Sequence, residues 1–136
     1  MTKEKDSIIG GKRKTSVAKA RVVPGTGAIS INNVPHHLLN KLQKLSIEEP
    51  LRIAKENIKR IDFDIKVKVV GGGRESQIEA ARLAIARALI FKTKSDKLKK
   101  AFESYDKHLL IADVRRKEAY KPDDSKARAK RQSSKR

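Results

Sequence analysis

Two stretches of the chain alternate between apolar and polar residues, which is the pattern of half-buried β-strands. In residues 15–23, small and branched apolar residues share one face, and Lys19 and Arg21 lie on the other. Residues 62–70 repeat the pattern more clearly, with Phe63 and three branched aliphatic residues on one face and charged residues on the other. Each strand is therefore expected to have one buried and one solvated face.

Two further short runs predict additional strands. Residues 28–32 alternate after a Pro-Gly-Thr-Gly turn, so we expect them to form a β-hairpin with residues 15–23. The apolar run at residues 109–112 predicts a last short strand. The sequence thus predicts four strands.

Apolar residues with helical spacing predict the remaining elements. Residues 36–45 favour a short helix, and a longer helix follows, for which Ser46 and Glu49 fit a capping box and Pro50 fits the first turn. Residues 76–91 contain five alanines, which would allow a helix to pack closely onto a sheet. Ser95 is placed to cap a final helix.

The distribution of charge divides the chain into three parts. Residues 1–13 are polar and are expected to be a mobile basic arm, and residues 14–114 are expected to form one α/β domain. The last 22 residues, 115–136, carry ten Lys/Arg against three Asp/Glu, a net charge of +7, with one bulky apolar side chain. Such a segment cannot bury enough apolar surface to offset its ordering entropy, so we expect an extended tail that becomes ordered on a partner.

The overall composition excludes several classes of protein. The chain has 136 residues, no Cys and a formal net charge of +18. It therefore contains no disulfide and no Cys-ligated metal site, and its apolar runs are too short to span a membrane. The N-terminus also lacks the apolar core of a secretory signal. The excess positive charge requires an anionic partner, and nucleic acid, a membrane surface and acidic proteins are the candidates.

The glycine-rich segment 71–73 lies between a predicted strand and a predicted helix. With Arg74 and Ser76 it approaches the G-x-G-x-x-G pattern of dinucleotide-binding proteins, and free backbone N–H groups at a helix start favour phosphate. The chain is too short for a doubly wound sheet, however, so RNA backbone is the favoured ligand over a dinucleotide. A purely structural turn is the alternative.

Other constellations of chemical groups are weaker. Asp62 and Asp64 could form a carboxylate pair for a metal or for acid–base catalysis, but Lys66 and Lys68 continue the same face, which favours surface charge pairing. The three histidines suggest a zinc site only faintly. A Walker A loop is absent, and nothing marks a serine as an activated nucleophile. We therefore expect neither a cofactor nor catalysis.

The basic segments carry the strongest signal, because lysine and arginine bind phosphates and release counterions. Few aromatic residues are available to stack on bases, which disfavours a protein that reads the sequence of single-stranded RNA. No predicted helix has one basic and one aromatic face, which disfavours membrane binding. A DNA-packaging or architectural protein is the main alternative, and a nucleotide-dependent enzyme is a distant third. The residues expected to contact RNA are Lys12, Arg13, Lys14, Lys19, Arg21, Gly71, Gly72, Gly73, Arg74, Arg115, Arg116, Lys117, Lys121, Lys126, Arg128, Lys130 and Arg131.

Three motifs, in order along the chain, resemble the family of the ninth ribosomal protein of the small subunit. The first is the basic segment 12–22 with its Pro-Gly turn, the second is the glycine-rich segment with the alanine-rich helix after it, and the third is the basic tail that ends in Ser134, Lys135 and Arg136. Together they cover about residues 10–136. The acidic pair within residues 121–128 is similar to the archaeal and eukaryotic branch of the family, and the short N-terminus favours the archaeal one.

This resemblance implies a fold and a set of partners. The family's fold is an α/β domain of the ribosomal S5 domain 2-like type, with a four-stranded sheet, packed helices and a long basic C-terminal extension. The resemblance implies a place in the head of the small subunit, on the ribosome in the cytoplasm, bound to small-subunit rRNA and beside neighbouring head proteins. It also implies that Lys135 and Arg136 contact the backbone of peptidyl-site tRNA.

Overall fold

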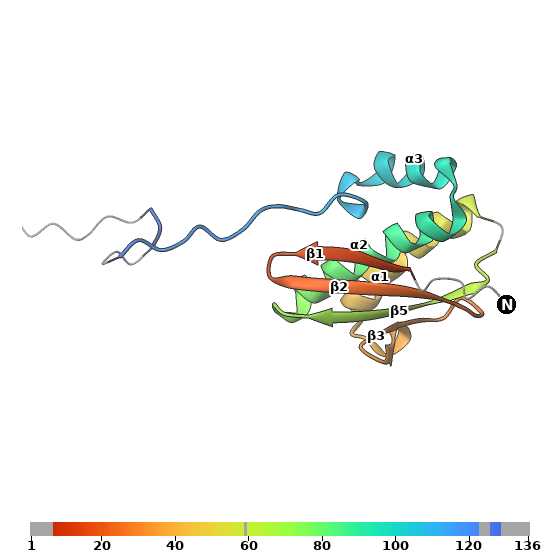
Figure 1. Ribbon diagram of the computed structural model, residues 1–136, viewed down its shortest axis with the longest axis horizontal. Helices are drawn as coiled ribbons and strands as arrows, with labels where there is room; N and C mark the ends of the chain where they lie inside the picture. The colour runs from red at the N-terminus through yellow and green to blue at the C-terminus, as the bar shows by residue number, and fades with distance from the viewer. Residues whose placement is uncertain (1–6, 59, 123–125, 129–136) are drawn as a thin grey trace, which may run out of the picture.

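The computed structural model describes residues 7–58, 60–122 and 126–128. Figure 1 shows a single sheet with the helices on one of its faces, and a segment that leaves the domain at one end. The mixed α/β architecture is therefore confirmed. The sheet has five strands rather than the predicted four, in the order β1-β2-β5-β3-β4. The strands are β1 (Ile8–Arg13), β2 (Ser16–Pro24), β3 (Ile29–Ile31), β4 (Val34–Pro35) and β5 (Phe63–Val70).

The first strand lies within the segment that was expected to be a mobile arm, so that expectation is wrong for residues 8–13. β1 pairs antiparallel with β2 along its whole length. Gly11 is buried against the helix behind the sheet, and a Cβ atom there would lie 2.3 Å from the carbonyl oxygen of Ala80. The Gly10-Gly11 pair suggests flexibility in the sequence, but in the fold Gly11 permits close packing. Residues 1–6 lie outside the described part of the chain.

The predicted hairpin between residues 15–23 and 28–32 is also wrong. β5 lies between β2 and β3, antiparallel to the first and parallel to the second. The turn that follows β2 is held instead by Asp64 of β5. Its Oδ1 accepts hydrogen bonds from the backbone N–H groups of residues 26, 27 and 28, at 2.8, 2.9 and 2.8 Å. These bonds direct the chain across the end of β5 rather than back along β2.

The helices are η1 (His36–Leu38), α1 (Lys41–Asn57), α2 (Arg74–Thr93), α3 (Asp96–Tyr105) and η2 (Lys107–Leu109). The predicted helix start at Ser46 is wrong, because α1 begins five residues earlier and the Ser46 hydroxyl donates to the carbonyl of Leu42 inside the helix. Pro50 is buried within α1. The cap by Ser95 is confirmed, since its Oγ accepts from the backbone N–H of Leu98. The predicted strand at 109–112 is replaced by η2 and a turn.

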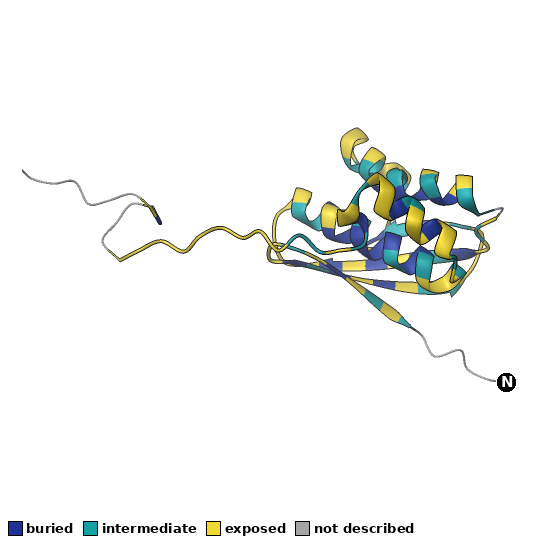
Figure 2. Ribbon diagram, turned by 90° about the horizontal axis from the view of Figure 1, so that it is seen from above, coloured by how far each residue is buried: buried dark blue, intermediate teal, exposed yellow. Residues whose placement is uncertain are grey.

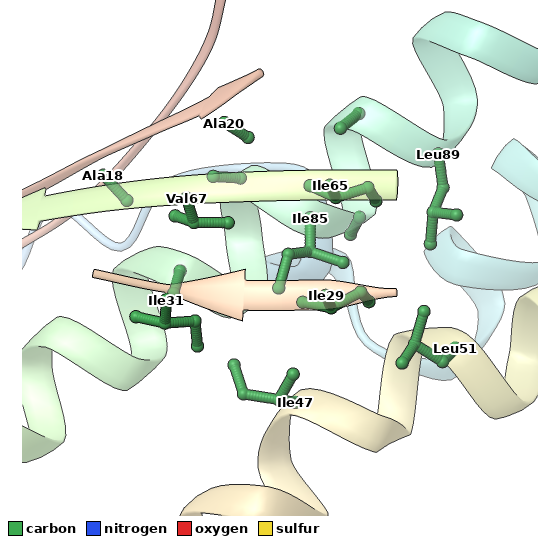
Figure 3. Close-up of a cluster of buried hydrophobic side chains, with 14 of the residues drawn as sticks. Ala18, Ala20, Ile29, Ile31, Ile47, Leu51, Ile65, Val67, Ile85 and Leu89 are labelled. Carbon is green, nitrogen blue, oxygen red and sulfur yellow. The ribbon is translucent and has the colours of Figure 1, made fainter. Parts of the chain in front are cut away.

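The core lies between the sheet and the two long helices. Every second residue of β5 is buried, from Phe63 to Val69, as the alternation predicts. Figure 3 shows Ile47 and Leu51 of α1 beside the strand residues of β3, with side chains of α2 completing the cluster. α2 buries nine residues, of which five are alanines. Figure 2 shows that buried residues line the inner faces, while the described segment beyond the domain is mostly exposed.

Candidate nucleic-acid interface

Three segments that are distant in sequence meet at one end of the sheet. They are the β1–β2 turn, the glycine-rich junction between β5 and α2, and the start of the C-terminal segment (Figure 1). An open cleft of about 710 Å³ lies between the turn and the C-terminal segment. We call it the hairpin–tail cleft, and it is lined by Arg13, Lys14, Thr15, Arg115, Arg116 and Lys117. Five of these six residues are cations, so the fold gathers two separately predicted sets of RNA-binding residues.

Lys14 occupies the β1–β2 turn in an unusual backbone conformation. Its φ is 50°, in the left-handed region that glycine and asparagine adopt with the least strain. For other residues this conformation costs roughly 1–2 kcal/mol. The Lys14 side chain is exposed at the mouth of the cleft. A lysine at this position thus supplies a positive charge at the expense of local backbone strain.

The first two glycines of the junction serve the fold itself. Gly71 and Gly72 have φ values of 78° and 65°, and a Cβ on Gly72 would lie 2.0 Å from Oγ of Ser16. The buried Ser16 hydroxyl donates to the carbonyl of Gly71 at 2.9 Å and lies 2.8 Å from the Ser76 hydroxyl. The geometry of the turn therefore explains why glycine is needed at positions 71 and 72. RNA contact at this junction stays a prediction.

The surface of the junction is formed by the start of α2. A Cβ on Gly73 would meet nothing within 4 Å, and Gly73 and Arg74 are both exposed. Arg74 therefore places an exposed cation at the positive end of the α2 dipole.

The C-terminal segment is anchored to the domain by ion pairs. Arg13 Nη1 lies 2.9 Å from Asp113 Oδ2, with the two side chains 15% and 11% exposed, and Arg13 also pairs with Glu79 of α2. Arg87 donates to the backbone carbonyls of Leu110 and Gly10, both at 2.8 Å. The charge of Arg13 is thus engaged inside the protein, a role that its place in a basic run did not indicate.

Asp113 connects this anchor to the cations of the cleft. Arg115 donates to it through both its backbone N–H and its guanidinium, the latter at 2.7 Å from Nη2 to Oδ2. These hydrogen bonds from Arg115, assisted by the charge of Arg13, hold the pKa of Asp113 well below its usual range. The carboxylate therefore stays ionised and keeps Arg115 beside the cleft.

Beyond the anchor, residues 114–122 are all exposed and form neither helix nor strand. Arg116 and Lys121 are both exposed to solvent. The Lys117 ammonium lies 4.4 Å from the centre of the Tyr120 ring, as in a cation–π contact. Arg128 pairs with Glu118 at 2.9 Å, and Lys126 is exposed. The expected RNA contacts Lys130 and Arg131, and the expected tRNA contacts Lys135 and Arg136, lie outside the described residues.

The side of the sheet that the helices leave uncovered is basic. Lys12, Lys19 and Arg21 project from β1 and β2 on this side, and Lys66 and Lys68 project from β5. We call these five residues the basic sheet face. Sequence reasoning did not assign Lys66 and Lys68 to RNA binding, although their strand alternation already placed them on the exposed side.

Asp64 does not show the charge pairing with the lysines of β5 that the sequence predicted. No ion pair described in the structure joins Asp64 to Lys66 or Lys68, and the carboxylate instead accepts the three turn N–H groups described above. The hydrogen bond from Ala28 lowers the pKa of Asp64 most, and the bonds from Thr26 and Gly27 and the charge of Lys66 add to this. Asp62 pairs with Arg60.

Within residues 7–58, 60–122 and 126–128, no three His, Asp or Glu side chains are grouped so that they could hold a metal ion. The described helices include none that is long and apolar enough to cross a membrane.

Comparison with known proteins connects this architecture to a family. The sequence profile described as "Ribosomal protein S9/S16" matches residues 11–136. The chain belongs to the ribosomal protein S9 family. The matched range begins within β1 and includes both sides of the hairpin–tail cleft.

Members of the family from archaea are similar over nearly their whole length. The protein "Small ribosomal subunit protein uS9" of Desulfurococcus amylolyticus is 44% identical over 128 residues, which cover 93% of this chain and 90% of that protein. The proteins of the same description from Methanococcus vannielii and Methanococcus maripaludis are each 44% identical over 127 residues, covering 91% of this chain and 93% of theirs. The expected resemblance to archaeal members of the family is thus confirmed.

The anchor at Asp113 predicts a pH dependence. A carboxylate whose pKa is lowered by folding contributes stability above its ordinary pKa and loses it as the pH falls through the lowered value. We therefore expect the tail anchor to persist at pH values where ordinary aspartates are protonated. NMR titration of the Asp113 carboxyl carbon should give a midpoint well below the ordinary value, and Arg115→Ala should return it toward that value. An ordinary midpoint in the unaltered protein would contradict the anchor.

Proposed function

We propose that this protein is a structural component of the small ribosomal subunit, where it binds small-subunit rRNA in the head. The hairpin–tail cleft is the observation that carries this proposal. It brings cations from the start and the end of the domain together around an open space of about 710 Å³. The archaeal relatives are named as proteins of the small ribosomal subunit, which supports the same proposal.

The chemistry of the cleft suits RNA backbone rather than bases. Lysine and arginine neutralise phosphates and release counterions, which drives binding without reading sequence. Among the described residues, none that lines the cleft is an aromatic side chain that could stack on an unpaired base. An A-form helix hides its base edges in a narrow major groove, so recognition by shape and phosphate contact is the mode that fits. On this proposal the chain acts by binding, not by catalysing a reaction.

Anchoring of the C-terminal segment gives the tail a fixed starting point. Because Asp113 and Leu110 are held on β1 and α2, the residues after Val114 begin next to the cleft. We propose that this basic segment continues along rRNA between helices, where its cations offset phosphate repulsion. Neighbouring proteins of the head complete its surroundings.

The end of the tail is proposed to reach the peptidyl-site tRNA. This proposal rests on the resemblance of the terminal Ser134-Lys135-Arg136 to the family's tail and on a family match that extends to residue 136. Two terminal cations suit a tRNA phosphate backbone for the same reason that the cleft suits rRNA. A general nucleic-acid packaging protein shares the positive charge, but membership of a ribosomal protein family favours rRNA.

A substitution at Lys14 tests the role of the cleft. Lys14→Asn removes one charge and introduces a residue that tolerates positive φ, so the free energy of unfolding should stay unchanged or rise by up to about 1 kcal/mol. Binding to a small-subunit rRNA transcript should weaken severalfold. The slope of log affinity against log salt concentration should fall by about 0.7–0.9, as expected for one lost phosphate contact. Filter binding at several salt concentrations measures both quantities.

A matched control is Lys100→Gln, which removes one exposed charge from α3 on the helix side of the domain. It should leave the salt slope within error of the unaltered protein. Equal losses for the two variants would mean that net charge alone drives binding, and the cleft would then have no special role.

Removal of Lys135 and Arg136 tests the tRNA contact. We expect subunit assembly to proceed normally, because the domain and the tail anchor remain intact. Affinity of the assembled subunits for peptidyl-site tRNA should fall severalfold, or initiation should lose fidelity. Normal assembly with unchanged tRNA affinity and fidelity would refute this contact.

A further inference from the structure

A groove between two helices differs in chemical character from the basic surfaces of the domain. It runs between α1 and α3, and Figure 1 shows that α3 lies farther from the sheet than α2 does. Its volume is about 510 Å³, and we call it the α1–α3 groove. Two of its lining residues are acidic and one is a cation, whereas the hairpin–tail cleft is lined by five cations and no acid. The lining residues are Leu45, Ser46, Glu49, Arg52, Ile53, Glu56 and Tyr105.

Large apolar side chains are exposed around this groove. Leu42 and Leu45 are 77% and 42% exposed, and because they lie three residues apart in α1 they share one side of the helix. Tyr105, at the end of α3, is 60% exposed. Single apolar side chains on a surface are ordinary, but a group of them around a groove indicates a surface that another protein covers.

The aromatic residue of the groove is held in place by polar contacts within the domain. The Tyr105 hydroxyl donates to Glu49 Oε1 at 2.6 Å, and Glu49 is paired in turn with Arg82 of α2. The Arg82 side chain is largely buried and also pairs with Asp106. Tyr105 is therefore positioned before a partner binds, so binding orders this side chain at little entropic cost. Tyrosine is also among the residues enriched at the energetic centres of protein–protein interfaces.

The charges of the groove indicate the chemistry of its partner. Arg52 pairs with Glu48 at 3.1 Å, so the one cation of the groove is already compensated. Glu56 is exposed, and none of the ion pairs described in the structure involves it. An RNA phosphate in the groove would face the carboxylates of Glu49 and Glu56, which repel it. A Lys or Arg side chain of a protein would instead form an ion pair with Glu56.

We propose that the α1–α3 groove binds a basic amphipathic helix of another protein of the small subunit. Apolar side chains of that helix cover Leu42, Leu45 and Tyr105, and one of its cations pairs with Glu56. From Leu42 to Glu56, α1 spans roughly 21 Å, or about four helical turns, which is long enough for anchors at helical spacing on a partner helix. The inference rests on the proposed place in the small subunit, and it adds a protein-binding surface to the proposed rRNA contacts.

The test uses small subunits purified from cells in which this protein carries the photoreactive residue benzoylphenylalanine in place of Leu45. This residue is apolar, so the groove should still bind its partner. Irradiation should cross-link position 45 to another protein of the subunit, through a peptide in which Lys or Arg and apolar residues alternate with helical spacing. The same photoreactive residue in place of Arg116, in the hairpin–tail cleft, should cross-link to rRNA instead.

A charge reversal in the groove tests the ion pair. Glu56→Lys should lower the yield of the protein cross-link from position 45 severalfold, because it replaces an attraction with a repulsion. Glu103→Lys is the matched control, since Glu103 is exposed on α3 but does not line the groove. It changes the net charge equally and should leave the yield unchanged. An unchanged yield in Glu56→Lys, or equal losses in both variants, would overturn the inference.

The outcomes separate this inference from the proposed function. Cross-linking of position 45 to rRNA, to a second copy of this chain or to nothing would overturn the docking inference, while an rRNA cross-link from position 116 would still support the proposed function. Absence of that rRNA cross-link would contradict the proposed function, whatever position 45 contacts. If the substitution of Leu45 keeps the protein out of subunits, the photoreactive residue is placed at Arg52, an exposed lining residue of the groove, and the same outcomes decide.

Discussion

The close approach of α2 to β1 and β2 is the contact on which the rest of the structure depends. It is made by small residues on both sides, with Gly11, Ala18 and Ala20 on the sheet and Ala80 and Ala84 on the helix, all buried. A Cβ on Gly11 would lie 2.3 Å from the carbonyl oxygen of Ala80 and 2.7 Å from the backbone nitrogen of Ala84. Interiors packed at this density leave no room for an added methyl group without a backbone shift.

This contact also determines where the charges lie. Because α1 and α2 cover one side of the sheet, the strand cations are exposed on the other side. Because β1 is fixed on α2, Arg13 can reach both Glu79 and Asp113, and the start of the C-terminal segment is held beside the β1–β2 turn. The basic cleft is therefore a product of packing, assembled from residues about 100 positions apart in the sequence.

The sequence predicted local elements better than their pairing. Alternation identified β2 and β5 because each has one buried face, and the spacing of apolar residues located α2 and α3. The pairing of β2 was missed because its partner, β5, lies far along the sequence. The turn after β2 is held by Asp64 and its three N–H bonds, a non-local interaction without a pattern in the sequence. β1 was missed because Gly10 and Gly11 resemble a flexible linker until α2 is present to pack against Gly11.

For the candidate site, too, the sequence predicted local features but not the contacts made by tertiary structure. Basic runs identified Lys14, Arg116 and Lys117 as surface cations, which the cleft brings together. Periodicity could have added Lys66 and Lys68, because strand alternation places them on the face of Lys19 and Arg21 once β2 and β5 are neighbours. The internal role of Arg13 could not be predicted, since it depends on Asp113 being placed beside β1 by tertiary structure.

The most direct test of this account compares Gly11→Ala with its neighbour Gly10→Ala. A Cβ on Gly10 would meet nothing within 4 Å, so Gly10→Ala serves as the control for a glycine replacement in the same strand. Urea unfolding should show Gly11→Ala destabilised by about 1–3 kcal/mol, as for overpacking in a core, with a parallel loss of rRNA affinity at native conditions. Gly10→Ala should change stability by less than about 1 kcal/mol and bind rRNA normally. Equal stability and equal rRNA affinity of the two variants would contradict the claim that close packing of β1 on α2 builds the RNA-binding end.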